Sequence, residues 1–207
     1  MSWTFTHIPD IALAIWQHLV LVGVSIAIAF AISLALGIWT ARRPRAYAGV
    51  LGVTGAIYAV PSLALFALLI PLVGLGRVPA IIGLTAYSLL ILVRNVATGL
   101  REVPPEIVEA AEGMGFGRAQ QLVRIELPLA LPVIVAGLRI ATVTVIGIAT
   151  IAAYINAGGL GALVFAGIDQ RFAEKIIVGG LLTSLLAIGA DFSLSRLELR
   201  LRAHRAA

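Results

Sequence analysis

Residues 101–128 read REVPPEIVEAAEGMGFGRAQQLVRIELP, a polar run inside an otherwise apolar chain. The run holds five of the ten acidic residues of the sequence. Apolar stretches flank it on both sides, and each is near the ~20 residues of helix that cross ~30 Å of hydrocarbon. We therefore expect this run to be a polar connection between two membrane spans.

The composition of the chain is that of an integral membrane protein. Its 207 residues are 60% hydrophobic and 12% charged, whereas about 25% of the residues of a soluble domain are charged. The apolar runs predict an all-α membrane protein with about five transmembrane helices in a single domain, residues 1–207. The expected spans are Ile11–Thr40, Tyr47–Leu69, Pro79–Thr98, Leu129–Tyr154 and Lys175–Leu194.

The basic residues predict the orientation of these spans. An amino terminus outside the cell leaves ten arginines in cytoplasmic segments, against three basic residues outside. The ten are Arg42, Arg43, Arg45, Arg101, Arg118, Arg124, Arg196, Arg200, Arg202 and Arg205, and the three are Arg77, Arg171 and Lys175. Under the positive-inside rule, the carboxy terminus and the polar run then face the cytoplasm. The net charge of +5 is thus a topology signal, and no nucleic-acid partner is expected.

The polar run is expected to fold as two short helices joined by a turn. Pro105 suits the first turn of a helix, which continues to Met114. Three glycines, Gly113, Gly115 and Gly117, are expected to supply a positive-φ turn. A second helix, Arg118–Leu127, ends where Pro128 opens the next span. The first helix has an acidic face of Glu106, Glu109 and Glu112 and an apolar face of Ile107, Val108, Ala111 and Met114.

Such a hairpin is small enough to sit in a groove on another protein. Ala110 and Ala111 allow the close approach that docking of a helix in a groove requires. The alternative is an amphipathic hairpin that lies on membrane lipid. Lipid-bound hairpins usually present lysine and arginine, and anionic lipid would repel three glutamates on one face. Protein docking is therefore the favoured interpretation.

Two further segments break the helical pattern and are candidate pathway or gate elements. Pro61, followed by Ser62, must free a backbone carbonyl inside the second span. This fits either a kinked helix that faces the pathway or a tolerated kink in a packed helix. Residues 156–167 predict a short re-entrant or interfacial helix on the outer side. Their glycines Gly158, Gly159 and Gly161 serve either an external gate or close helix packing.

Four ionisable residues fall within or near the expected spans. His18 and Arg94 lie close to span ends, so we expect them to reach the interface. Arg139 and Asp191 lie deeper, and two unpaired charges in the membrane would be costly. We expect Arg139 and Asp191 to form an ion pair in the packed interior.

Several kinds of chemistry are absent from the sequence. The chain has no cysteine, and its three histidines are too scattered for a helical metal pair. A phosphate-binding loop needs a Gly-Lys-Ser/Thr sequence, but the only lysine, Lys175, is preceded by Glu174. We therefore expect no catalytic residue, cofactor or metal, and a source of energy on a partner.

The polar run resembles the cytoplasmic loop of the permease subunit of type I binding-protein-dependent ABC importers. The matching pattern is EAA-x3-G-x9-I-x-LP, formed by Glu109, Ala110, Ala111, Gly115, Ile125, Leu127 and Pro128. Residues 60–95, 103–116, 126–143 and 149–168 resemble the osmoprotectant branch, whose permeases serve glycine betaine, carnitine and choline. The resemblance implies a second permease subunit, alike or different, two ATPase subunits and an extracytoplasmic substrate-binding protein. It also implies that the helix with Glu109 is the coupling helix.

Two alternatives stay open at this stage. One is an importer of the same class for another small solute, such as an amino acid or a sulfonate. The other is an ion-coupled carrier, although carriers of that kind usually keep carboxylates or histidines inside their spans.

Overall fold

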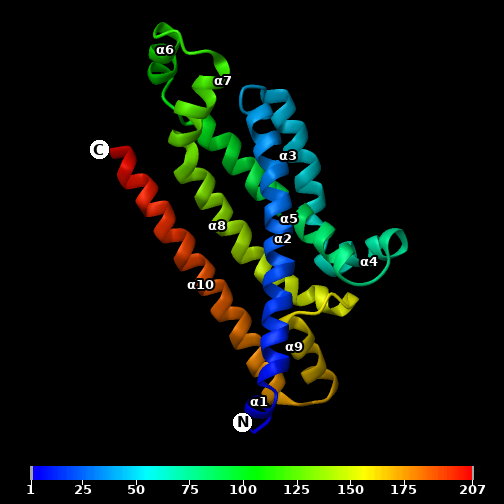
Figure 1. Cartoon of the computed structure of the whole chain (residues 1–207). Helices are drawn as coiled ribbons and strands as arrows, with labels where there is room; N and C mark the ends of the chain where they lie inside the picture. Colours follow the sequence, from blue (N-terminus) through cyan, green and yellow to red (C-terminus); the bar gives the residue numbers. More distant parts are fainter. Residues whose placement is uncertain (1, 207) are drawn as a thin grey trace.

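The computed structural model describes residues 2–206, and for residue 2 and residues 203–206 it describes the backbone alone. Within this part of the chain every regular element is helical, which confirms the all-α prediction. Among the described residues four helices are long and apolar enough to cross a membrane, and the bent pair of α3 and α4 makes a fifth span when its halves are counted together. Figure 1 shows the arrangement of these helices. The chain is therefore a multi-pass membrane protein.

The elements follow one another in a simple order. They are α1 (Ser2–Thr6), α2 (Ile8–Ala41), α3 (Pro44–Ala59), α4 (Ser62–Val73), α5 (Arg77–Arg101), α6 (Pro105–Gly113), α7 (Arg118–Gln121), a π turn (Leu122–Glu126), α8 (Leu127–Ile151), a 3-10 turn (Ala152–Ile155), α9 (Leu160–Asp169) and α10 (Ala173–Ala206).

Helices α2, α5 and α8 form the centre of the bundle. Their facing sides are rich in small residues, and Gly137 of α8 lies so close to Asn95 of α5 that a Cβ would come within 2.3 Å of the Asn95 Cβ. Small residues permit such close packing in membranes, where burial of apolar area does not favour one helix partner over lipid. Helix α10 leans against α8 and exposes Leu181, Leu185 and Ile188. These exposed side chains suit contact with lipid or with another subunit.

The second expected span is broken and not merely kinked. Its two halves, α3 and α4, meet at an angle of 97° around Val60 and Pro61, so the expected second span is two helices and not one kinked helix. The carbonyl of Val60, which the break frees, accepts a hydrogen bond from the Tyr87 hydroxyl of α5. A neighbouring helix therefore satisfies the carbonyl, as a low-dielectric environment requires.

Pro128 does not separate two helices as expected. The helical run extends without interruption from Arg118 to Ile155, through the π turn and into α8. The amide of Leu127 donates to the carbonyl of Leu122, which is a bond across the wider π turn. Pro128 lies in the first turn of α8, directly after this turn. The chain stays helical there because the π turn accommodates a residue that has no amide hydrogen to donate.

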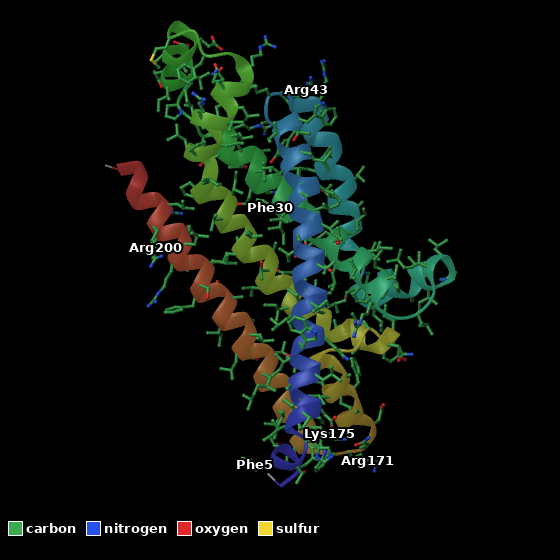
Figure 2. All side chains as sticks on the ribbon, viewed as in Figure 1. Phe5, Phe30, Arg43, Arg171, Lys175 and Arg200 are labelled. Carbon is green, nitrogen blue, oxygen red and sulfur yellow. The ribbon has the colours of Figure 1, made fainter. Side chains whose placement is uncertain are left out.

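The two ends of the bundle carry different elements. Helices α6 and α7 project from one end, and the first residues of α2 lie with α9 at the other (Figure 1). Arg43 lies at the hairpin end, whereas Arg171 and Lys175 lie at the opposite end (Figure 2). Helix α10 runs well beyond the expected end at Leu194, toward the hairpin end. The side chain of Arg205 lies outside the part of the chain that is described.

Candidate functional site

The polar run folds as a hairpin at the tip of the bundle. Helix α6 begins at Pro105, and the chain then reverses at Gly115, where φ is +83°. The amide of Phe116 donates to the carbonyl of Ala111, which closes the turn at 3.0 Å. Gly113 and Gly117 were also expected to have positive φ, but only Gly115 does, because one left-handed residue is enough to end a helix.

Only part of the expected apolar face of α6 is buried within the hairpin. Ala111 is fully buried, and Val108 is half-buried and accepts a hydrogen bond from the Gln121 side chain. Ile107 and Met114, the other two residues of the expected apolar face, are 40% and 68% exposed. The hairpin is too small to cover four apolar positions, so part of its apolar surface stays open to a partner.

The motif residues Glu109 and Ala110 lie on the outside of α6, as does Glu106. The side chains of Glu106, Glu109 and Ala110 are all exposed. Together with Ile107 and Met114 they make a surface of mixed charge and apolar character, which we call the docking surface. A mixed surface of this kind suits a protein groove with a basic rim and an apolar floor.

The other motif residues form the root of the hairpin. Ile125 in the π turn and Leu127 at the start of α8 are half-buried, while Pro128 is exposed. Leu127 packs against the cluster of Ala41, Val96, Leu100, Ala130 and Ile134, which joins α2, α5 and α8 at the hairpin end of the bundle. The root thus rests on the core of the bundle.

Two charged residues fasten the base of the hairpin to the end of α2. Arg101, the last residue of α5, donates from Nε to the Ala41 carbonyl at 2.7 Å and from Nη2 to the Thr40 carbonyl at 3.2 Å. Arg42 Nη2 donates to Oε1 of Glu126, a largely buried carboxylate, at 2.7 Å. Between α6 and these residues lies a cleft of about 360 Å³. The segment that enters the hairpin and the segment that leaves it are therefore both attached to α2.

The candidate gate elements lie at two levels of α2: the break at Pro61 lies beside its middle, and Gly158, Gly159 and Gly161 lie near its end opposite the hairpin (Figure 1). Pro61 is exposed at the break between α3 and α4, and Ser62 is the first residue of α4. Gly158 and Gly159 have φ of +80° and +79°, so residues with side chains would be strained there. At Gly161, α9 touches α8 so closely that a Cβ would lie 2.0 Å from the Thr150 oxygen.

Residues 156–167 do not all belong to the short helix that was expected. Helix α9 begins at Leu160 and extends to Asp169. Its ten residues are too few to cross a membrane, in agreement with a short apolar element. The preceding residues form a turn in which Asn156 also has positive φ, at 64°.

His18 does not reach the membrane interface as the sequence suggested. Its side chain is fully buried, with Nε2 3.2 Å from the Ile146 carbonyl of α8. Its Nδ1 accepts a hydrogen bond of 3.3 Å from the Leu160 amide of α9. These two partners belong to other helices far along the chain, so the local sequence around His18 held no signal of them. For Arg94, which is exposed, the expected position at the interface stays a prediction.

Arg139 and Asp191 form an ion pair in the structure. The distance from Arg139 Nε to Asp191 Oδ1 is 2.6 Å, and Glu198 joins the pair through a contact of 3.2 Å with Nη1 of Arg139. The expectation of a packed interior was wrong for the chain by itself, because the two paired side chains are 36% and 46% exposed. They lie on the open side of α8 and α10, where Glu198 also pairs with Arg202 at 2.7 Å.

This arrangement predicts unequal effects of removing the two partners. Substitution Arg139→Leu leaves Asp191 and Glu198 as neighbouring like charges, whereas Asp191→Leu leaves Arg139 paired with Glu198. We therefore expect Arg139→Leu to lower the midpoint of thermal unfolding in detergent more than Asp191→Leu does. Equal midpoints for the two variants would mean that the contact with Glu198 contributes nothing.

The described residues include no group of three or more potential metal ligands. At the hairpin end the described residues show an exposed face of α6 and the attachments of the hairpin base to α2.

The chain is similar in sequence and in fold to known membrane transport proteins. The model of the family described as "Binding-protein-dependent transport system inner membrane component" matches residues 33–203. A carnitine transport permease protein of Listeria monocytogenes is 39% identical, with 90% of this chain and 85% of that protein covered. An osmoprotectant import permease protein of Salmonella typhimurium is 42% identical, with coverage of 88% and 87%. The solved structure of an inward-facing MetNI methionine ABC transporter superposes with a TM-score of 0.81 at 25% identity, covering 92% of this chain and 95% of that one.

Proposed function

Because this chain belongs to the family of binding-protein-dependent transport system inner membrane components, we propose that it carries osmoprotectant quaternary ammonium compounds across the cell membrane as one permease subunit of an ATP-driven importer. The hairpin with its docking surface is the observation that carries this proposal. Its exposed glutamates, its exposed apolar side chains and its attachment to α2 suit transmission of force from a partner.

The partners follow from what the chain lacks. It has a single lysine and no phosphate-binding loop, so ATP is hydrolysed by separate ATPase subunits that receive α6. A second permease subunit, identical or different, completes the pathway, and an extracytoplasmic binding protein delivers the solute. The excess of arginine at the hairpin end favours an amino terminus outside and a carboxy terminus in the cytoplasm.

The proposed mechanism is alternating access. Binding of ATP favours one arrangement of the ATPase subunits, and the docked hairpins follow them. The attachments of Arg101 and Glu126 pass this displacement to α2, while α9 lies at the outer end of the pathway and the break at Pro61 lies beside the middle of α2. In this account α9 is the outer gate.

The substrate class rests on the similar proteins. The names of the two similar permeases described above contain the words carnitine and osmoprotectant. Quaternary ammonium groups are typically held by aromatic faces. At the break, Tyr58 packs against the buried Tyr87 with ring centroids 5.7 Å apart, and the 38% exposed Tyr58 offers such a face. Methionine is the second candidate, because the superposed structure is a methionine transporter.

Uptake by vesicles that contain the assembled transporter tests this proposal. We expect accumulation of radiolabelled carnitine, glycine betaine or choline that requires ATP inside the vesicles and the ATPase subunits. Methionine serves as the competing solute. Accumulation driven by a proton or sodium gradient without ATP would show an ion-coupled carrier instead and would overturn the proposal.

A further inference from the structure

The first residues of α9 are capped by side chains of another helix. An α-helix begins with amides that have no partner within the helix, and a side chain just before it usually accepts from one of them. The residue before α9 is Gly159, which has no side chain to do this. Instead, Gln17 Oε1 accepts from the Gly159 amide at 3.0 Å, and His18 Nδ1 accepts from the Leu160 amide at 3.3 Å.

The partners fix the protonation pattern of the His18 ring. The Leu160 amide can only donate, so Nδ1 must be the accepting nitrogen. The Ile146 carbonyl can only accept, so Nε2 carries the proton that it donates. One buried ring therefore connects α2 to two other helices, with a different nitrogen for each.

The other contacts of α9 are of a different kind. Gly161 touches the backbone of Thr150 in α8, and Gly167 and Gly179 make the contact with α10 close. At these glycines no side chain interlocks the two helices, so the packed helices can slide past each other by small amounts. The hydrogen bonds that Gln17 and His18 accept are directional, so they hold the beginning of α9 to α2 while its sides can slide.

Helix α2 reaches from this cap to the base of the hairpin. From His18 to Thr40 is roughly 33 Å of helix at ~1.5 Å per residue. No proline interrupts α2 between Asp10 and Ala41, whereas α8 contains Pro132 and follows a π turn. At its inner end the carbonyls of Thr40 and Ala41 are held by Arg101, and Arg42 is held by Glu126. Figure 1 shows α2 as one unbroken rod between these two places.

We propose that Gln17 and His18 are positioning residues that tie the outer gate helix α9 to α2, so that displacement of the cytoplasmic hairpin moves the gate. This inference rests on the proposed function, since it assumes that the hairpin receives force from an ATPase. Helix α2 is then the connecting element. The hydrogen bonds of Gln17 and His18 to the first residues of α9, which we call the joint, attach α9 to its outer end.

Two substitutions of His18 distinguish a role in holding α9 from a role in packing alone. In His18→Asn the side-chain oxygen takes the place of Nδ1 and keeps the bond to α9, while the bond to α8 is lost. In His18→Gln the side-chain amide nitrogen takes the place of Nε2 and keeps the bond to α8, while the bond to α9 is lost. Both variants remove the ring and one hydrogen bond, so a purely structural role predicts similar defects.

The experiment measures solute uptake and ATP hydrolysis by the assembled transporter in vesicles. We expect the ratio of uptake to hydrolysis to stay within about twofold of wild type in His18→Asn and to fall at least about fivefold in His18→Gln. The same ratio for both variants would overturn the proposal. If neither folds, Gln17→Met decides, because it removes the bond to Gly159 at a half-buried position, and an unchanged ratio there would count against the joint.

A second readout does not depend on the solute. Hydrogen exchange of the α9 amides in the assembled transporter is compared with and without bound ATP. We expect ATP to change this exchange in wild type and His18→Asn but not in His18→Gln, and an equal change in all three would overturn the proposal. If wild type takes up none of the three solutes while this pattern holds, the substrate assignment fails and the joint stands.

Discussion

Substitution Glu109→Lys is expected to abolish solute uptake while the protein still inserts into the membrane. Glu109 lies exposed on α6, in the docking surface with Glu106 and Ala110. A partner groove that accepts this acidic surface presents positive charge, and like charges placed against each other in an interface weaken binding by at least roughly a hundredfold. The bundle itself loses nothing, because no core side chain is altered.

The measurement compares three quantities for this variant: its amount in the membrane, the amount of ATPase that copurifies with it, and its uptake. Glu102→Lys is the matched control, because it makes the same change of charge at an exposed site in the same polar run but outside α6. We expect normal insertion for both variants and loss of ATPase for Glu109→Lys alone. Full uptake by Glu109→Lys at normal expression would contradict the docking role.

Substitution Gly161→Val is expected to prevent α9 from taking its place against α8. A Cβ at Gly161 would lie 2.0 Å from the Thr150 oxygen and 2.7 Å from the carbonyl carbon of the same residue. Both are backbone atoms of another helix and cannot turn aside as a flexible side chain can. Overpacking typically costs about 1 to 3 kcal/mol, and we expect a value at the upper end of that range.

The control for this variant is Ala162→Val, the next residue of α9, whose side chain is exposed. It adds a branched side chain to the same helix without a clash. We expect Gly161→Val to lower the thermal unfolding midpoint and to abolish uptake, and Ala162→Val to behave nearly as wild type. Equal behaviour of the two variants would show that the contact between α9 and α8 is not needed.

The parts of the structure that depend on neighbouring residues could be predicted from the sequence. Pro105 marks the start of α6, and Gly115 makes the turn that follows it. Both effects are local, because a proline fixes its own φ and a glycine permits its own positive φ. Long apolar runs likewise predicted α2, α5 and α8 to within a few residues.

The parts that depend on distant residues could not be predicted. Pro61 predicted a disturbance, but the angle of 97° depends on α5, whose Tyr87 satisfies the free carbonyl of Val60. His18 near a helix end fitted an interface position, whereas its partners Ile146 and Leu160 lie 128 and 142 residues away. The contribution of Glu198 to the pair of Arg139 and Asp191 also required the extended α10, which continues past its apolar part.

We propose above that the hairpin lies in the cytoplasm and contacts an ATPase subunit. The chain has no cysteine, so Met114→Cys places one reactive thiol on α6, at a side chain that is 68% exposed. We predict that this thiol crosslinks to an ATPase subunit in the assembled transporter, and that membrane-impermeant reagents reach it only from the cytoplasmic side. Labelling of this thiol from outside intact cells, with no crosslink to the ATPase, would contradict the account.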